Sequence, residues 1–387
     1  MPSAKARSYL ALVFVPLVAW SKDAAVVAVV TAAATVLANR DARAAVFAPP
    51  RLTWPLLLGA AFFIWALAAV TWSPAHRMTD WMKAAPVVLA ALGVGRYFAR
   101  APTDMLEPLA RPVCCAVGAL FVLLAVERVT GGGIIGLARP GDSTERLFDL
   151  ISPGLALLSC LLFPAVYLAE AATGRRWAGP ALIAVCFVLA LTYRMDAAPV
   201  AIACAAISYG IVRQCKRAGV VLVAVGIAAV ALSWGPLAAV AWRHGEQTWL
   251  TAHANLNWGY RVEIWNRVFE LIGAKPWTGY GFDSARSLAQ GAGVTFLHPH
   301  NGLLQVWLEL GAVGVALLLV WAGLSLRAYL APPRDARVLA TFAATVTAVA
   351  VFWLISFGIW QGWWLAAIGL TGVALVLVAR VSPSPHP

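Results

Sequence analysis

Long, continuous apolar runs alternate along the chain with short polar connections. Runs such as 26–37, 86–94 and 313–320 show no strict alternation of apolar and polar residues, which favours helices over half-buried strands. A membrane-spanning helix needs ~20 residues, with a range of about 17 to 25. The sequence predicts about twelve such helices, at roughly 8–21, 23–39, 54–72, 79–97, 112–127, 150–170, 177–194, 197–213, 218–235, 301–326, 336–357 and 360–380.

One long polar segment interrupts this pattern between about 234 and 301, and it carries four of the 6 His residues. Within it, the stretch 260–272 places Ile264, Val268 and Leu271 on one stripe, which predicts an amphipathic helix lying on the membrane or over the bundle. The sequence therefore divides into transmembrane helices over 1–235, a loop with amphipathic helices over 236–300, and transmembrane helices over 301–387.

The composition agrees with a membrane protein. The chain is 61% hydrophobic and 12% charged, whereas soluble proteins average about 25% charged residues. We therefore expect an all-α, polytopic integral membrane protein with one large outer loop. The apolar run near the start is interpreted as a retained first helix, because no small-residue cleavage site follows it.

The net charge of +12 is explained by topology, so no nucleic-acid partner is expected. Cytoplasmic connections of membrane proteins are enriched in Lys and Arg. With both termini in the cytoplasm, 17 of the 29 Lys and Arg residues fall on the inner side, and among short loops the bias is 17 against about 7. This orientation places the long polar segment outside.

Several cations lie on the outer side against this bias and therefore need a reason. Arg194 is the sharpest case, because it sits in a tight connection between two helices, where a charge is costly unless it is paired or hydrated. An ion pair with Asp196 and a functional role both remain open for it. Arg261 lies in the amphipathic stretch, where a solvated side chain is the plainer interpretation. The outer Arg candidates are Arg139, Arg146, Arg194, Arg261 and Arg267.

His298 and His300 flank Pro299 immediately before a predicted helix. A neutral His can accept a proton from an attacking hydroxyl, which contributes ~10²–10⁴-fold in rate. A His-x-His pair could also bind a metal ion. Asp283 is the nearest acid, however, and no carboxylate-rich segment completes a site, so we expect none.

Arg and His at the outer rim of a helix bundle fit a transfer reaction. Arg binds phosphate and diphosphate through forked, charge-assisted hydrogen bonds. The set therefore suits transfer from a lipid diphosphate to a hydroxyl, with the lipid tail in the bundle and the sugars in the polar loop. Trp side chains of the loop, including Trp265, could stack on sugars, although interfacial anchoring is the commoner role of Trp at this depth.

Two parts of the loop resemble a known family. Arg261-x-x-x-Trp265, followed by Pro276-x-x-Gly279-x-Gly281, is similar to a pattern of the bacterial O-antigen ligase and O-antigen polymerase superfamily. These are polytopic membrane glycosyltransferases that act on undecaprenyl-diphosphate-linked glycans.

Two further motifs extend the resemblance. His300-Asn301, followed after nine residues by Gly311 and Gly314, resembles the ligase motif of a His, a polar residue and a spaced Gly pair. The pair 193–194 resembles the family's Ser-Arg, with Tyr in place of Ser.

The resemblance implies an O-antigen ligase. Such an enzyme transfers glycan from undecaprenyl diphosphate to lipid A–core, at the periplasmic face of the bacterial inner membrane and among its lipids. The resemblance further implies an inverting reaction without metal or cofactor. Arg194 and Arg261 would engage the donor diphosphate, and His300 would activate or orient the acceptor hydroxyl. The residues expected to contact substrate are His298, Arg267, Arg139, Arg146 and Trp265.

Three alternatives remain open. An O-antigen polymerase would join carrier-linked repeats to one another, and a protein O-oligosaccharyltransferase would glycosylate proteins. A transporter is the third, but it should place charges at the membrane midplane near broken helices. Here the charges collect at the outer rim.

Overall fold

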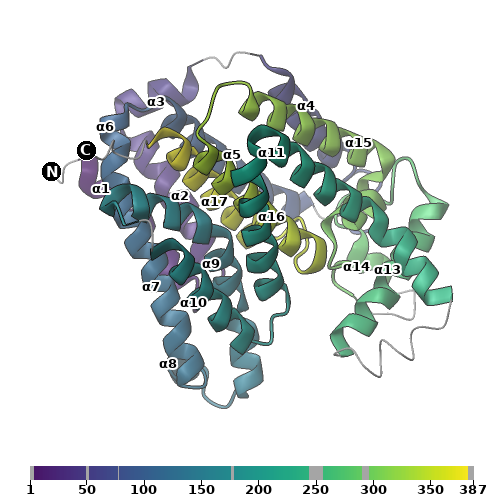
Figure 1. Ribbon diagram of the computed structural model, residues 1–387. Helices are drawn as coiled ribbons and strands as arrows, with labels where there is room; N and C mark the ends of the chain where they lie inside the picture. Colours follow the sequence, from purple (N-terminus) through teal and green to yellow (C-terminus); the bar gives the residue numbers. More distant parts are fainter. Residues whose placement is uncertain are drawn as a thin grey trace.

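The computed structural model describes residues 4–48, 52–76, 78–175, 178–243, 256–289 and 296–381, and the regular elements of these ranges are all helices (Figure 1). In chain order they are α1 (Ala4–Leu17), α2 (Ala24–Ala38), α3 (Arg40–Phe47), α4 (Trp54–Ala68), α5 (Met78–Arg100), α6 (Thr103–Leu106), the 3-10 helix Glu107–Leu109, α7 (Ala110–Val129), α8 (Gly133–Ala138), α9 (Thr144–Thr173), α10 (Ala178–Thr192), α11 (Ala197–Arg243), α13 (Leu256–Ala274), α14 (Ala285–Ala289), α15 (Gly302–Leu330), α16 (Ala336–Ile355) and α17 (Gly362–Arg380).

The described part of the chain contains 7 helices that are long and apolar enough to cross a membrane. Three shorter apolar helices, α2, α4 and α10, accompany them. This all-helical architecture is that of a multi-pass membrane protein. Each segment predicted from the sequence overlaps a helix, although the number of membrane crossings stays a prediction.

Helix α11 differs most from the expectation. The segments predicted at 197–213 and 218–235 are its two arms, joined at Lys216, where the backbone leaves helical geometry (φ 52°, ψ −126°). The second arm also continues to Arg243, past Pro236 and the predicted loop boundary. The helix outlasts the apolar run because a loss of hydropathy does not by itself end a helix, and the boundary of the loop stays a prediction.

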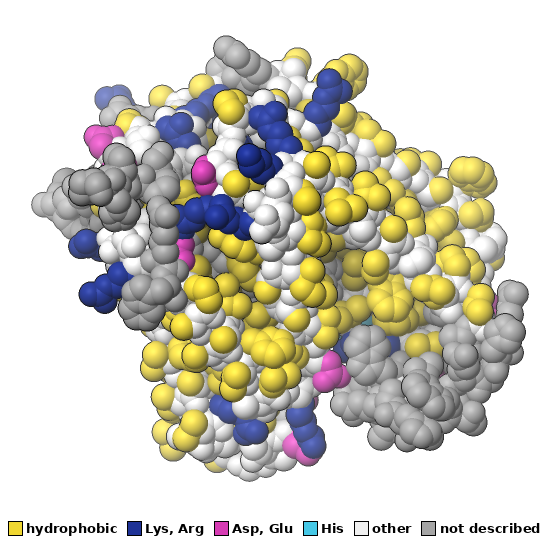
Figure 2. All heavy atoms as spheres, viewed as in Figure 1, with side chains coloured by type: hydrophobic (Ala, Val, Ile, Leu, Met, Phe, Trp, Pro, Cys, Tyr) yellow, Lys and Arg dark blue, Asp and Glu magenta, His cyan; other side chains and the backbone are white. Residues whose placement is uncertain are grey.

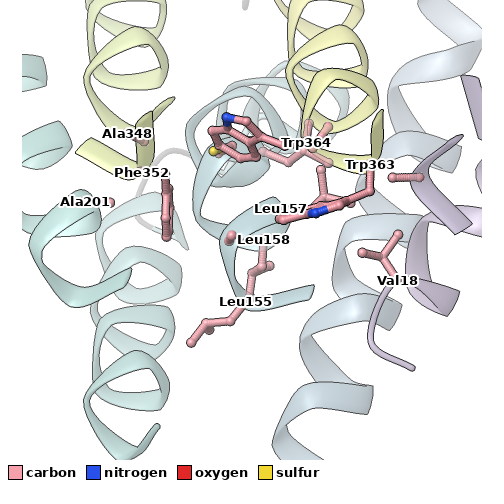
Figure 3. Close-up of a cluster of buried hydrophobic side chains, with 14 of the residues drawn as sticks. Val18, Leu155, Leu157, Leu158, Ala201, Ala348, Phe352, Trp363 and Trp364 are labelled. Atoms are coloured by element: carbon pink, nitrogen blue, oxygen red, sulfur yellow. The ribbon is translucent and has the colours of Figure 1, made fainter. Parts of the chain in front are cut away.

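Helix α9 forms the centre of the bundle. Its Leu155 and Leu157 are fully buried and pack in the same cluster as Phe352 of α16 and Trp364 of α17 (Figure 3). Close packing of this kind holds membrane helices together, since lipid tails remove most of the hydrophobic driving force between them.

The surface is divided by charge. Figure 2 shows most of the visible Lys and Arg side chains at the end of the molecule that carries α3 and α6 and fewer at the opposite end, with hydrophobic side chains covering the middle. Helix α8 lies at the opposite end of the bundle (Figure 1). This is the distribution that the positive-inside rule describes.

The segment that contains the Pro-x-x-Gly-x-Gly pattern packs along α15. Helix α15 is broken at Gly311 (φ 68°, ψ −172°). Next to this break, the N–H groups of Tyr280 and Gly281 donate to the carbonyls of Leu308 and Glu309 at 2.9 and 2.8 Å. The backbone of one segment thus pairs with the carbonyls of the other.

The glycines of both motifs permit this close approach. Gly279 and Gly311 have positive φ angles of 66° and 68°. A Cβ on Gly279 would lie 2.5 Å from the carbonyl carbon of Glu309, and a Cβ on Gly311 would overlap the carbonyl of Trp277. The backbones could not meet if either position carried a side chain.

The carboxylate of Glu309 completes this junction. It is fully buried and accepts hydrogen bonds from the Trp360 indole, from the Gln305 amide at 3.1 Å, and from the N–H groups of Asp283 and Ala285 at 3.2 and 3.4 Å. One side chain therefore joins α15, the segment before α14 and the connection between α16 and α17.

We predict that Gly311→Ala destabilises the protein by about 1–3 kcal/mol or more, because the backbone angles at this position are almost restricted to glycine and the added Cβ meets the neighbouring backbone. The melting temperature in detergent measures the effect. Gly323→Ala is the matched control, since it lies on the same helix with open space around it. Equal melting temperatures for the two variants would contradict this interpretation of the break.

Candidate functional site

His300 is oriented by the chain that follows α16. Its Nδ1 lies 2.7 Å from the carbonyl oxygen of Ser356. Because a carbonyl oxygen only accepts, Nδ1 must carry the proton, and in the neutral ring Nε2 is then the acceptor. The backbone of His300 has a φ of 54°, in the left-handed region that residues other than glycine seldom adopt. His300 is therefore set to accept a proton at Nε2.

His298 stands beside it in the opposite tautomer. Its Nδ1 accepts from the backbone N–H of His300 at 3.2 Å, and the two ring centroids are 4.2 Å apart. Gly358 makes room for this ring, since a Cβ there would lie 3.0 Å from His298. Within the described residues, no three His, Cys, Asp or Glu side chains form a cluster that could hold a metal ion.

Both imidazoles are kept neutral by their surroundings. Burial lowers the pKa of His298 to about 3, and the charges of His300, Arg286 and Arg261 act in the same direction. Burial also lowers the pKa of His300, assisted by Arg261 and opposed by the hydrogen bond to Ser356. A neutral His300 can act as a proton acceptor near pH 7.

Trp265 of α13 packs under the loop that carries His298 and His300. Its indole donates to the carbonyl of Pro299 at 2.8 Å, and its ring packs on Trp234 with centroids 4.8 Å apart. The side chain is 1% exposed. It offers no open face for a sugar in this structure, and the expected stacking role stays a prediction. The sequence could not show this, because Trp at such a position is equally compatible with the core.

Asn301 fixes the other end of the loop by capping α15. Its Oδ1 accepts from the N–H of Leu304 at 3.0 Å, which satisfies one of the free donors of the first helical turn. The cap therefore gives a structural reason for Asn at the position after His300. It determines where the helix starts and hence where the imidazole stands.

Arg261 reaches the His pair from α13. This helix has the predicted amphipathic stripe, with Ile264 and Val268 fully buried, and it packs against α11 and α15. The side chain of Arg261 is half-buried. Burial lowers the pKa of Arg261, while the nearby charge of Asp196 raises it, and a guanidinium stays protonated in either case. The loop after α10 and helix α13 therefore meet here.

Arg286 joins the same group, although the sequence analysis did not select it. It lies on the five-residue helix α14, and its charge acts on His298. Its Nε atom is buried and has no hydrogen-bond partner among the described residues. No spacing pattern marks this residue, so only the fold could place it beside the imidazoles.

Arg194 extends the site along the rim, with a different partner from the one considered in the sequence. Its Nη1 donates to Glu145 at 2.6 Å, and the two side chains are 71% and 69% exposed. Arg146 is paired nearby in sequence with Asp142 at 3.5 Å. Exposed ion pairs such as these contribute only about 0–1 kcal/mol. An anionic ligand could therefore replace the acidic partners.

Two other expected residues are not placed in this group. Arg267 forms an ion pair with Glu270 on its own helix at 3.0 Å. Arg139 is exposed at the end of α8. The described structure records no contact between either residue and the His pair. It thus brings Arg261, Arg286, His298 and His300 together, with Arg194 on the adjoining loop.

The fold and this site define a class of protein: a multi-pass membrane protein with neutral His and several Arg side chains at one end of its bundle. Comparison with known sequences shows which family the region around this site resembles. The family model described as O-antigen ligase matches residues 179–319, a range that contains Arg194, Arg261 and His300.

Curated relatives agree with this match. A Rickettsia prowazekii protein, named as a candidate polysaccharide ligase, is 30% identical over 140 residues, and its Rickettsia typhi counterpart is 29% identical over 140 residues. Each alignment spans about a third of this chain and about a third (33%) of the relative. Together the matches show that this part of the chain is similar to the O-antigen ligase family.

We predict that His298 makes folding stability depend on pH. Because the folded pKa lies near 3, below the ordinary value of 6.5, the unfolded chain binds the proton more readily. Stability is therefore complete above pH 6.5 and falls by up to about 1.4 kcal/mol per pH unit as the pH drops toward 3. His298→Asn keeps an acceptor for the N–H of His300 in an Asx-turn but does not titrate. Melting temperatures from pH 7.5 to 4.5 should fall less in this variant, and parallel curves would refute the assignment.

Proposed function

We propose that this protein is an O-antigen ligase. It transfers a glycan from undecaprenyl diphosphate to lipid A–core at the periplasmic face of the bacterial inner membrane, with both termini in the cytoplasm. The reaction is an inverting displacement that needs neither metal nor cofactor. The observation that carries the proposal is the neutral His300, with Nε2 as its acceptor, beside Arg261 in the range matched by the O-antigen ligase family.

The proposed reaction assigns one role to each side chain. Nε2 of His300 accepts the proton of the acceptor hydroxyl, and the hydroxyl oxygen forms a bond to the anomeric carbon of the donor. The bond between that carbon and the diphosphate oxygen breaks, and its electron pair leaves with the diphosphate. A single displacement from the opposite face inverts the anomeric configuration.

The guanidinium groups stabilise the charge that develops on the leaving diphosphate. Arg261 is half-buried, so its attraction to an anion is screened less than that of a fully exposed side chain. Arg194 is exposed and pairs with Glu145, so it can exchange that carboxylate for a phosphate oxygen. Arg binds phosphate through two parallel hydrogen bonds, which orients the donor as well as neutralising it.

The first test is transfer in detergent with EDTA. Purified protein, undecaprenyl-diphosphate O-antigen and lipid A–core should give a ladder of glycosylated lipid A–core on gels. His300→Ala should lower the rate by about 10²–10⁴-fold, because it removes the proton acceptor. The melting temperature of the variant provides the folding control.

The other outcomes of this assay identify other activities. Lengthening of the carrier-linked glycan without a ladder would indicate a polymerase. Transfer that appears only with a protein acceptor would indicate an O-oligosaccharyltransferase. Full activity of His300→Ala would exclude the proposed role of the imidazole, and loss of the ladder in EDTA that added metal restores would exclude a metal-independent reaction.

We predict that lysine substitutions at two arginines of α13 affect kcat/KM differently. Arg261→Lys keeps the charge but loses the forked geometry, so kcat/KM for the lipid-linked donor should fall about tenfold or more. Arg267→Lys should change kcat/KM by less than about twofold, since the charge of Arg267 is already engaged by Glu270 in an exposed pair. An equal loss of kcat/KM in Arg261→Lys and Arg267→Lys would contradict the special role of Arg261 in binding the donor.

A further inference from the structure

A cavity of about 630 Å³ opens between α9, α10, α11 and α16. This volume lies within the range of roughly 300–1,000 Å³ that is typical of pockets for organic ligands. Its walls are mostly apolar, and they include the buried Phe163 of α9 and Ile202 of α11. Three of its lining residues, Pro180, Ala184 and Ala206, are exposed, so the cavity is open to the side of the bundle.

The cavity lies at the other end of the bundle from the His site. Gly179 and Pro180 line it from the first turn of α10, whereas Arg194 follows the last turn of that helix. Fifteen helical residues separate the two ends, which corresponds to about 22 Å at 1.5 Å per residue. The end of the cavity at Gly179 and Pro180 therefore lies toward the opposite membrane leaflet, away from the site described above.

One end of the cavity is charged. Glu170 and Arg337 form an ion pair there, with side chains 11% and 14% exposed, and Arg337 also lies over the ring of Tyr167. Since each charge of this pair compensates the other, the pair itself attracts neither anions nor cations strongly.

Arg213 supplies the remaining charge. It also lines the cavity, its side chain is exposed, and no ion pair among the described residues involves it. Arg217, four residues later, donates to the carbonyl of Pro332, a contact that leaves its charge uncompensated. The rim of the cavity is thus positive.

We propose that this cavity binds an anionic phospholipid, with an alkyl chain between the helices and the phosphate headgroup against Arg213. The apolar walls match the chain, and the lateral opening lets it enter from the bilayer. The cation at the rim matches the negative headgroup. This lipid is separate from the glycan donor, and the proposal holds whether or not the protein is a ligase.

Native mass spectrometry of the full chain in detergent tests the headgroup. After exchange into mixed micelles, the protein should retain phosphatidylglycerol about tenfold more than phosphatidylcholine, and Arg213→Gln should remove most of this preference. Arg175→Gln is the matched control, because it removes an exposed charge from the α9–α10 connection without lining the cavity. Equal retention of the two lipids, or equal effects of the two substitutions, would overturn the proposal.

A second pair of variants tests the chain. Ala206→Trp should fill the opening and lower the retention of phosphatidylglycerol about tenfold. Ile207→Trp, on the neighbouring exposed face of the same helix and outside the cavity, should leave retention unchanged. Unchanged retention in Ala206→Trp would place the lipid elsewhere. Because the two tests alter opposite parts of the cavity, misfolding of one variant leaves the other decisive.

Discussion

A buried carboxylate fixes the geometry on which the site depends. An acid in an apolar interior is costly unless donors surround it, and Glu309 collects donors from three separate parts of the chain. One of them, Trp360, lies in the connection between α16 and α17, which also supplies the carbonyl of Ser356 to His300 and the space at Gly358 for His298. The orientation of both imidazoles therefore depends on the junction around Glu309.

The helices could be predicted from the sequence because hydropathy is a local property. The amphipathic helix over 260–272 was predicted correctly for the same reason: its stripe needs only the spacing of Ile264 and Val268. The break in α11 was foreseen as a gap between two helices, whereas the extension to Arg243 was not. Polar residues near a membrane end are compatible with a loop and with a helix that projects from the bilayer.

The candidate site was predictable only as a set of residue types. Arg194 was considered with Asp196, its sequence neighbour, but it pairs with Glu145 on another helix, while Asp196 acts on Arg261. Arg286 and Glu309 were not selected, because their roles come from neighbours far away in sequence.

The motif glycines illustrate the same limit. Their spacing suggested a family, but their physical purpose, the close approach of two backbones at Gly279 and Gly311, is visible only in three dimensions. The pattern around His300 was therefore found as a motif before its reason was known. Asn301 caps α15, Gly311 breaks the same helix, and Gly358 leaves room for the ring of His298.

Electrostatics give the site its chemical character. Burial, assisted by the nearby guanidinium groups, lowers the pKa values of both imidazoles, so cations that suit a diphosphate also help to keep His300 able to accept a proton. Near pH 7 the Arg side chains stay protonated while the His side chains stay neutral.

We propose that a lipid diphosphate binds between Arg261 and Arg194 with its reacting carbon facing His300. Cryo-electron microscopy of the protein with an undecaprenyl-diphosphate glycan tests this most directly. The account predicts phosphate oxygens about 3 Å from both guanidinium groups, the Arg194–Glu145 pair opened, and the anomeric carbon on the Nε2 side of His300. A diphosphate bound away from these arginines, with the Arg194–Glu145 pair intact, would contradict it.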